Sequence, residues 1–523
     1  MKKKAINPLK VLRVILALIL FTPMLLFFVD FTDVLPDSFS ALFHLQIMPI
    51  FFSGVVILLV IYLLLTLFFG RIYCSVLCPA GILQDIINRI ACIGKKKKDG
   101  KMRFQYHKPA NWLRYVILGV TALLAVFGIT EFCLLLDPYS NFGRIVTHLF
   151  QPIVIWVNNL LSEFLTARGN YSLYNVSVDI SIPAIIAALI ALDVFALMAY
   201  FRGRLFCNTI CPVGALLSLV SRHSLFRITI DENACNKCKV CERSCKAEAI
   251  DSTNGKTDMS NCVTCFNCIS SCNKKAIQFR FAPAASFPKK QMKPEMPKQQ
   301  DISDNKFTES RRSFITTSVS LAGAVPLLAL AQGHNHANGK LPITPPGSLN
   351  IERFKDYCTG CHLCVVQCPS HVLKPAGLEY GPDYMLKPYM SFEKKYCNYS
   401  CTVCSQVCPT HAIKPITEEE KKVVQVGVVE FHKGMCVVYT DETDCGACTE
   451  HCPTKAVYMV PYKGTLTIPN INPNICIGCG GCESICPVRP NRAIAVRANA
   501  VHQTAEKPKE EEVREVNLDN FGF

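Results

Sequence analysis

Residues 358–369 read Cys-Thr-Gly-Cys-His-Leu-Cys-Val-Val-Gln-Cys-Pro. The spacing CxxCxxCxxxCP gathers three cysteines on one tight loop and adds a fourth just before a proline. Such a run supplies several thiolates to one inorganic cluster and is typical of [4Fe–4S] ferredoxins. Paired CxxC units also bind zinc, but zinc sites rarely need a fourth cysteine followed by proline. The run therefore predicts an iron–sulfur site.

The C-terminal part of the chain contains four such runs, each closed by a proline. In the second and third runs the first gap is longer, which lengthens a loop without changing the number of ligands. The runs are Cys358, Cys361, Cys364, Cys368; Cys397, Cys401, Cys404, Cys408; Cys436, Cys445, Cys448, Cys452; and Cys476, Cys479, Cys482, Cys486. These cysteines predict four clusters.

Two further runs lie nearer the N-terminus, and Lys246 and Asn273 replace their closing prolines, which leaves the local turns less constrained. In two-cluster ferredoxins the fourth cysteine of each run ligates the other cluster. One cluster is therefore expected on Cys235, Cys238, Cys241 and Cys272, and the other on Cys262, Cys265, Cys268 and Cys245. The whole chain is expected to hold about six [4Fe–4S] clusters.

Two other interpretations of the cysteines were weighed. Small secreted proteins use many cysteines for disulfides, but tight runs of this kind do not suit a disulfide framework. Residues 358–362 also match CxxCH, the attachment site of c-type haem. The ferredoxin run needs the same two cysteines, so an iron–sulfur cluster is the preferred prediction.

The composition indicates a membrane protein with soluble parts. Half of the 523 residues are hydrophobic and only 18% are charged. The net charge of +15 does not indicate nucleic-acid binding, because the basic residues cluster beside apolar segments, where membrane topology explains them.

Four segments have about the length and apolar character of a membrane-spanning helix, which needs roughly 20 residues. They are residues 11–29, 48–69, 113–135 and 182–201. Lysine and arginine precede the first segment and fill the loop 71–112, whereas the loops 30–47 and 136–181 carry few. The positive-inside rule therefore predicts a multi-pass protein of the bacterial inner membrane with a cytoplasmic N-terminus.

Residues 310–331 begin Ser-Arg-Arg-Ser-Phe-Ile and continue as an apolar stretch. This resembles an internal twin-arginine export signal. A domain that acquires its clusters in the reducing cytoplasm would have to cross the membrane already folded. The four-run part is therefore expected in the periplasm and the two-run part in the cytoplasm. The alternative is a chance Arg pair before a fifth helix, and cleavage after Ala331 stays open.

A second motif occurs twice. Gly-Arg-Ile-Tyr-Cys-Ser-Val-Leu-Cys-Pro-Ala-Gly at 70–81 recurs as Gly-Arg-Leu-Phe-Cys-Asn-Thr-Ile-Cys-Pro-Val-Gly at 203–214. Each copy follows an even-numbered apolar segment, which suggests a pseudo-twofold bundle. The four thiols, Cys74, Cys78, Cys207 and Cys211, are candidate ligands of one further cluster or another metal. Redox-active thiols and purely structural cysteines are the alternatives.

Two carboxylates lie within the apolar segments. Asp193 falls in the fourth and Glu131 near the end of the third. A carboxylate inside a bilayer is costly, so both are candidates for accepting protons from a quinol, the alternative being a neutral acid bonded to a neighbouring helix. Cys92 and Cys133 are assigned no role.

Residues 1–281 resemble the NapH ferredoxin-type membrane proteins and the membrane half of NosR, through the apolar segments, the two CxxxCP motifs and the two-cluster ferredoxin. Residues 307–500 resemble the NapG/MauM ferredoxin-type proteins, through the twin-arginine segment and the four runs. The resemblance implies that outer and inner runs of the four pair with each other. It also implies quinol oxidation in the membrane and electron delivery to a periplasmic reductase.

Two alternatives to this function remain. In the first alternative, the electrons come from a cytoplasmic ferredoxin rather than from quinol and pass outward across the membrane. Alternatively, the protein would donate electrons or handle metal during maturation of a periplasmic metalloenzyme, which His334 and His336 slightly favour. In every case the clusters carry the chemistry. No substrate-converting site is visible in either ferredoxin part, so the chain is either a quinol dehydrogenase component or a carrier alone.

The expected fold is an α-helical membrane bundle, with four helices plus a fifth signal or anchor helix, carrying two α+β ferredoxin-like domains. The expected boundaries are 1–204 for the helices, 205–281 for the two-cluster domain, 282–309 for a flexible linker, 310–331 for the twin-arginine segment, 332–500 for the four-cluster domain and 501–523 for a charged tail.

Overall fold

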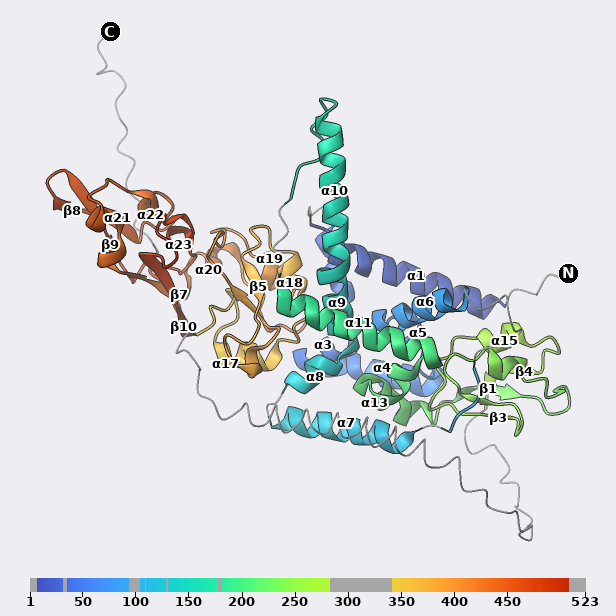
Figure 1. Cartoon of the computed structure of the whole chain (residues 1–523). Helices are drawn as coiled ribbons and strands as arrows, with labels where there is room; N and C mark the ends of the chain where they lie inside the picture. Colours follow the sequence, from blue (N-terminus) through green and yellow to red (C-terminus); the bar gives the residue numbers. More distant parts are fainter. Residues whose placement is uncertain are drawn as a thin grey trace, which may run out of the picture.

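The computed structural model describes residues 7–31, 35–93, 104–108, 110–127, 130–176, 181–282 and 341–507 (Figure 1). The twin-arginine segment, the two linker histidines, nearly all of the predicted linker and most of the charged tail lie outside these ranges. The described chain has a helical part in the middle. A module with two cysteine runs (residues 226–282, the two-run module) lies at one end, and a module with four runs (residues 341–507, the four-run module) lies at the other.

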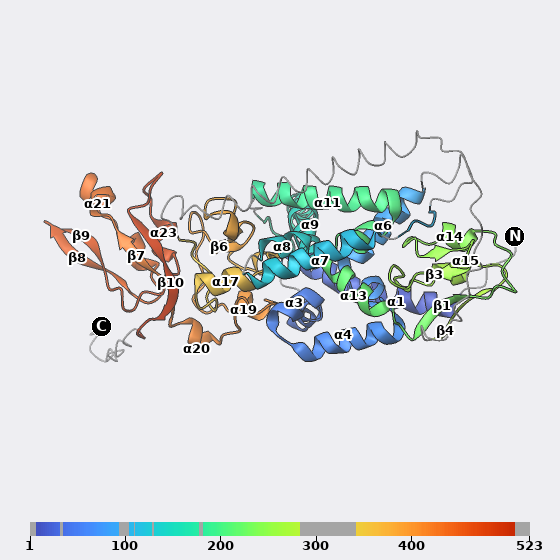
Figure 2. The same ribbon diagram turned by 90° about the horizontal axis from the view of Figure 1, so that it is seen from below.

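Four helices run roughly along the long axis between the two modules (Figures 1 and 2). They are α1 (Pro8–Val29), α4 (Val56–Phe69), α7 (Asn111–Val126) and α11 (Ile182–Arg202). Helix α1 begins at Asn7, whose side chain accepts a hydrogen bond from Leu9 N at 2.9 Å, with Pro8 in the first turn. Helices α4 and α11 end at Gly70 and Gly203, which have positive φ and turn the chain into the two CxxxCP motifs.

The structure corrects the prediction that residues 136–181 form a loop. Helix α9 (Pro138–Ile145), the π-helical turn η2 (Val146–Phe150) and helix α10 (Gln151–Thr166) make one apolar helix of 29 residues. Even its most apolar 18-residue window has a mean hydropathy of only 1.3, against 2.5 in α1, because polar residues such as His148, Gln151 and Asn158 fall within it. The sequence analysis therefore did not recognise it as a helix. Helix α10 lies across the direction of α4, α7 and α11 (Figure 1).

Two of the four predicted spanning segments are interrupted. Residues 48–69 form α3 (Ile47–Ser53) and α4, separated at Gly54, and residues 113–135 form α7 and α8 (Glu131–Leu136). Among the described residues, the helices long and apolar enough to cross a membrane are α1, Pro138–Thr166 and α11. These three helices suggest a membrane protein.

Each CxxxCP motif forms a short helix followed by a second helix. The first copy contains α5 (Tyr73–Val76) and leads into α6 (Pro79–Ile93), and the second contains α12 (Leu205–Thr209) and leads into α13 (Pro212–Ser221). In both, proline opens the second helix, where a missing N–H costs nothing.

The two-run module packs on the ends of α4 and α11. Its main sheet pairs β1 (Phe226–Ile230) with β4 (Ile277–Phe281) in antiparallel register, and β2 (Ile250–Asp251) pairs with β3 (Lys256–Thr257). Two short helices, α14 (Val240–Arg243) and α15 (Asn267–Ser271), complete it. Phe226 stacks on Phe69 with ring centroids 5.5 Å apart, and Leu225 N donates to Leu67 O at 2.8 Å. The module is therefore joined to the helices by backbone and side chain.

The four-run module is built from three two-stranded antiparallel sheets and short helices. The strands are β5 (Leu373–Pro375) with β6 (Pro388–Met390), β7 (Val424–Phe431) with β10 (Ile494–Thr504), and β8 (Val457–Lys463) with β9 (Leu466–Ile471). The helices are α17 (Ile351–Tyr357), α18 (Leu363–Val366), α19 (Val403–Gln406), α20 (Glu418–Lys421), α21 (Val437–Thr440), α22 (Ala447–Glu450) and α23 (Gly481–Ile485).

The four-run module docks on the helical part through buried contacts. Gln367 Nε2 donates to Phe27 O at 2.8 Å, and the fully buried Lys387 pairs with Glu131 at 3.1 Å. One continuous apolar cluster includes Phe28 of α1 and Phe354 of the four-run module. The two parts therefore share a core.

The docking predicts an effect of filling the space at Gly143 in α9. A Cβ there would lie 2.5 Å from Cys361 O and 2.9 Å from Phe28 Cζ. We expect Gly143→Ala to destabilise the protein by about 1–3 kcal/mol through overpacking, which lowers its melting temperature in detergent. Gly119→Ala is the matched control, because a Cβ at this helical glycine meets nothing within 4 Å. Equal melting temperatures for the two variants would contradict the docking.

Candidate iron–sulfur sites

The two runs of the two-run module exchange their fourth cysteines. Cys241 interacts electrostatically with Cys235 and with Cys272 of the other run, and Cys238 lies on the same loop. We call this group cage 1. Cage 2 is a cavity lined by Cys245, Cys262, Cys265 and Cys268 together with apolar side chains. The structure thus brings the cysteines together in the grouping expected from the crossover of fourth ligands.

The four-run module contains four analogous cages. Cage 3 consists of Cys358, Cys361, Cys364 and Cys408, cage 4 of Cys368, Cys397, Cys401 and Cys404, cage 5 of Cys452, Cys476, Cys479 and Cys482, and cage 6 of Cys436, Cys445, Cys448 and Cys486. The first run therefore exchanges its fourth cysteine with the second, and the third with the fourth. Each outer run pairs with the inner run next to it.

The four cages follow one another in a row. Cys364 of cage 3 interacts with Cys404 of cage 4, Cys397 of cage 4 with Cys479 of cage 5, and Cys482 of cage 5 with Cys448 of cage 6. Cys397 N also donates to Cys479 O at 2.9 Å. Cage 3 is next to the helical part, because Tyr139 of α9 contacts Cys361.

The residues of the cages fit an iron–sulfur cluster. Each cage offers four thiols, and mostly apolar side chains line those that form cavities. Burial raises the pKa of Cys358 to about 12, so this thiol would stay protonated without a cation beside it. Iron would supply that charge, and the thiolates would bind it in place of their protons. His362 is the histidine of the CxxCH sequence. Both of its ring nitrogens are in hydrogen bonds, Nδ1 with His148 and Nε2 with Leu386 O.

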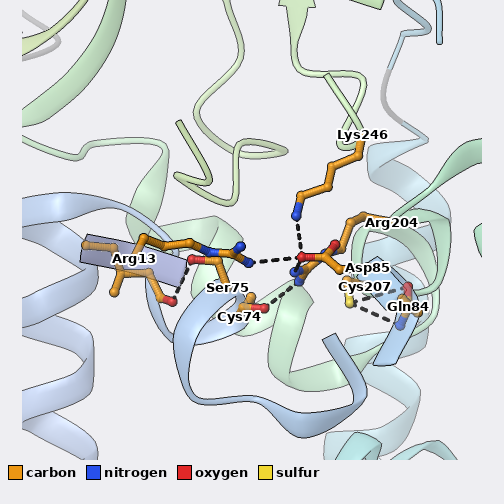
Figure 3. Close-up of polar contacts among 9 residues, drawn as sticks. Arg13, Cys74, Ser75, Gln84, Asp85, Arg204, Cys207 and Lys246 are labelled. Carbon is orange, nitrogen blue, oxygen red and sulfur yellow. Dashed lines mark hydrogen bonds and ion pairs between the residues drawn. The ribbon is translucent and has the colours of Figure 1, made fainter. Parts of the chain in front are cut away.

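The two CxxxCP motifs also come together. Cys74, Cys78, Cys207 and Cys211 are each 4% exposed, and Cys211 interacts with the other three. We call these four residues the CxxxCP quartet. Cys211 Sγ accepts a hydrogen bond from Gly214 N at 3.3 Å, and Gln84 Nε2 lies 3.4 Å from Cys207 Sγ (Figure 3).

The arginine of each motif crosses to the other copy. Arg71 Nη2 donates to Cys207 O at 3.0 Å, and Arg204 donates to Cys74 O (Figure 3). The last glycine of each motif leaves room for this crossing. A Cβ on Gly81 would lie 2.5 Å from Cys74 O and 2.7 Å from Arg204 Nη1, and Gly214 has the equivalent place beside Cys207 O and Arg71. The arginine and the last glycine of each motif thus have one structural explanation.

Asp85 of α6 joins the quartet to the rest of the molecule (Figure 3). It accepts two bonds from Arg204, at 2.8 and 2.7 Å, and pairs with Arg13 of α1 at 2.9 Å and with Lys246 of the two-run module. Burial would raise the pKa of Asp85, but the charges of Arg204, Lys246 and Arg13 outweigh it and hold this pKa well below its usual range. Lys246 is one of the two residues that replace the usual proline, and this ion pair gives it a role.

The two membrane carboxylates do not come together. Asp193 is exposed on α11, whereas Glu131 is engaged with Lys387. Cys133 is buried outside the cages, and its thiol donates to Thr121 O at 3.7 Å. Sequence reasoning missed Asp85, an acidic residue in the middle of α6. It also missed His148, which gave no signal beyond its polarity within an apolar stretch.

The chain matches two families of known domains. Residues 50–100 and 184–230, which contain the two CxxxCP motifs, match a 4Fe-4S binding domain, and residues 443–489 match a 4Fe-4S dicluster domain. No solved structure matches the chain.

Three relatives illustrate the similarity to whole proteins. The uncharacterized protein MJ0750 of Methanocaldococcus jannaschii is 30% identical over 43% of this chain and 78% of its own length. The methylamine utilization ferredoxin-type protein MauM of Methylorubrum extorquens is 32% identical over 34% of this chain and 84% of its own. The putative electron transport protein YccM of Escherichia coli is 24% identical over 43% of this chain and 55% of its own.

The cages and these similarities agree, so the chain belongs to the family of ferredoxin-type 4Fe-4S proteins that includes MauM, and it is an iron–sulfur electron-transfer protein.

Proposed function

We propose that this protein oxidises quinol in the bacterial inner membrane and passes the electrons through its four-run module to a soluble periplasmic redox enzyme. The observation that carries the proposal is the position of cage 3. This cage touches the apolar helices through Tyr139, while cages 4, 5 and 6 lead away from them. A donor dissolved in the membrane would therefore meet the first of four successive sites.

The proposed orientation puts the two-run module in the cytoplasm and the four-run module in the periplasm. The two modules occupy opposite ends of the helical part, which supports this topology (Figure 1). The resemblance to proteins with a twin-arginine signal supports it as well.

The CxxxCP quartet is proposed to hold a seventh cluster. Arg71 is fully buried, and its hydrogen bonds go to Asn208 Oδ1, Ser260 O, Cys207 O and Cys74 Sγ, none of them a carboxylate. A buried guanidinium without a counter-charge is strongly unfavourable. Four thiolates on a cluster would supply negative charge at this place, and the match of both motifs to a 4Fe-4S binding domain favours the same conclusion.

A second candidate function is the transfer of electrons outward from a cytoplasmic ferredoxin. Cys238 of cage 1 is exposed, as an entry point for a soluble partner requires, and cage 2 lies beside the quartet through Arg71 and Cys262. Beyond the quartet, Tyr73 donates to Gln46 Oε1 at 2.9 Å, and Phe43 lies 6.2 Å from Tyr139, measured between ring centroids. Buried groups thus fill the interval between the quartet and cage 3.

The seventh cluster predicts an iron count. Seven [4Fe–4S] clusters give about 28 iron atoms per chain and six give about 24. We expect Cys207→Ser/Cys211→Ser to lose about four iron atoms and a matching amount of labile sulfide in anaerobically purified protein. Cys133→Ser is the control, because Cys133 is buried but belongs to no cage. An unchanged iron content in the double variant would exclude a cluster at the quartet.

Quinol oxidation predicts direct reduction of the clusters. A reduced menaquinone analogue, mixed anaerobically with the purified protein, is expected to produce the electron paramagnetic resonance signals of several reduced clusters. Dithionite reduction provides the full signal for comparison. Reduction by a low-potential ferredoxin but not by the quinol would reject the first candidate function and support the second.

A further inference from the structure

A cavity of about 340 Å³ lies where the helical part meets the four-run module. It lies beside the π-helical turn η2 and the first turns of α10 and α11, and the four-run module closes its other side with α18 and β5. This volume is within the range of pockets that bind small molecules. π-helical turns are frequent at functional sites, and this one carries two of the lining residues, Thr147 and His148.

The hydroxyl of Thr147 lacks a hydrogen-bond partner. Thr147 is 5% exposed, and its Oγ1 is buried without a partner in the described parts of the chain. A buried hydroxyl left unpaired is unfavourable, so such groups in native proteins usually bind something. A ligand with a hydroxyl or carbonyl oxygen would satisfy it.

His148 presents an acceptor nitrogen by virtue of its partners. His362 Nε2 lies 2.8 Å from Leu386 O, a carbonyl that can only accept, so His362 carries its proton on Nε2. Its Nδ1 is then an acceptor and receives the Nε2 proton of His148 across 2.7 Å. In the neutral imidazole of His148, this leaves Nδ1 as the atom that accepts a further proton.

The cavity is adjacent to cage 3. Helix α18 forms the wall between them, because Val365 and Val366 line the cavity, while Leu363 and Cys364 line cage 3. On the side of the helices the lining also includes apolar side chains, Ile155 of α10 and Ile185 of α11. One molecule in this cavity would contact polar groups, apolar helices and the wall of an electron-transfer site.

We propose that this cavity binds the head group of a quinol, with Thr147 hydrogen-bonded to one of its oxygens and His148 as the proton acceptor. The proposal rests on the proposed function and specifies its site. Conversion of quinol to quinone breaks two O–H bonds and releases two protons and two electrons. The protons leave one after the other through His148 to solvent, and the electrons go one at a time to an adjacent iron–sulfur site, cage 3 behind α18.

The test is direct binding of a quinol analogue to the full-length protein. The probe is 2-heptyl-4-hydroxyquinoline N-oxide, whose fluorescence changes on binding, titrated into the detergent-purified protein under anaerobic conditions. We expect Thr147→Val, which keeps the shape of the side chain, to weaken binding about tenfold, in line with the loss of one hydrogen bond. His148→Leu is expected to weaken binding at least as much and to slow cluster reduction by quinol.

His44→Leu is the matched control. His44 packs on His411 of the four-run module with ring centroids 5.4 Å apart, and does not line the cavity. The substitution disrupts a histidine pair at the same interface but leaves the lining of the cavity intact. We therefore expect the affinity for the probe to be unchanged. Iron content and reduction by dithionite, measured in every variant, show that the clusters are loaded.

The outcomes separate the site from the function. If quinol reduces the wild type but Thr147→Val and His148→Leu bind the probe as the wild type does, the site is elsewhere and the proposal is overturned. If quinol does not reduce the wild type, the proposed function fails. Labelling the wild-type protein with an azidoquinone photolabel provides a readout that needs no substitution. If none of the labelled peptides contains residues 147–155 or 363–375, the proposed site is also overturned.

Discussion

The largely buried ion-pair network around Asp85 is the interaction on which the arrangement of the molecule depends. One carboxylate holds Arg13 of α1, Arg204 after α11 and Lys246 of the two-run module, so three segments distant in sequence meet at one point. Burying such charges gains little net stability, but removing one partner leaves the others uncompensated and costs several kcal/mol. The network therefore acts mainly by specifying one arrangement. It fixes Arg204 in the position from which its guanidinium reaches Cys74 O.

The quartet depends on this arrangement because its two halves hold each other. Arg71 and Arg204 each leave their own motif and bind a carbonyl of the other. Neither copy of the motif is complete alone, which explains why the sequence carries the motif twice. The same exchange occurs in the cages, where each run gives its fourth cysteine to its neighbour. At all of these places a local sequence repeat becomes a site only when two copies pack together.

The sequence predicted the parts of the molecule that depend on local spacing. Cysteines two and three residues apart must lie on one loop, so the cages followed from the runs. Hydropathy found α1 and α11, but it missed the helix Pro138–Thr166, because the polar residues that line an interior or a cavity also lower its mean hydropathy. The contacts of Asp85 could not be predicted, since they join residues up to 161 positions apart. The histidine pair could not be predicted either, because His148 and His362 meet only when the four-run module docks.

The docking also bears on the two candidate routes of electrons. The proposed quinol cavity lies on the side of cage 3, and the quartet lies on the side of cage 2. Electrons from a quinol in that cavity would reach cage 3 without passing the quartet. The quartet and the two-run module would then be needed only for a donor on the other side. In both proposed routes the four-run module is the exit for electrons, whether they start from the proposed cavity or from a soluble donor at the exposed Cys238.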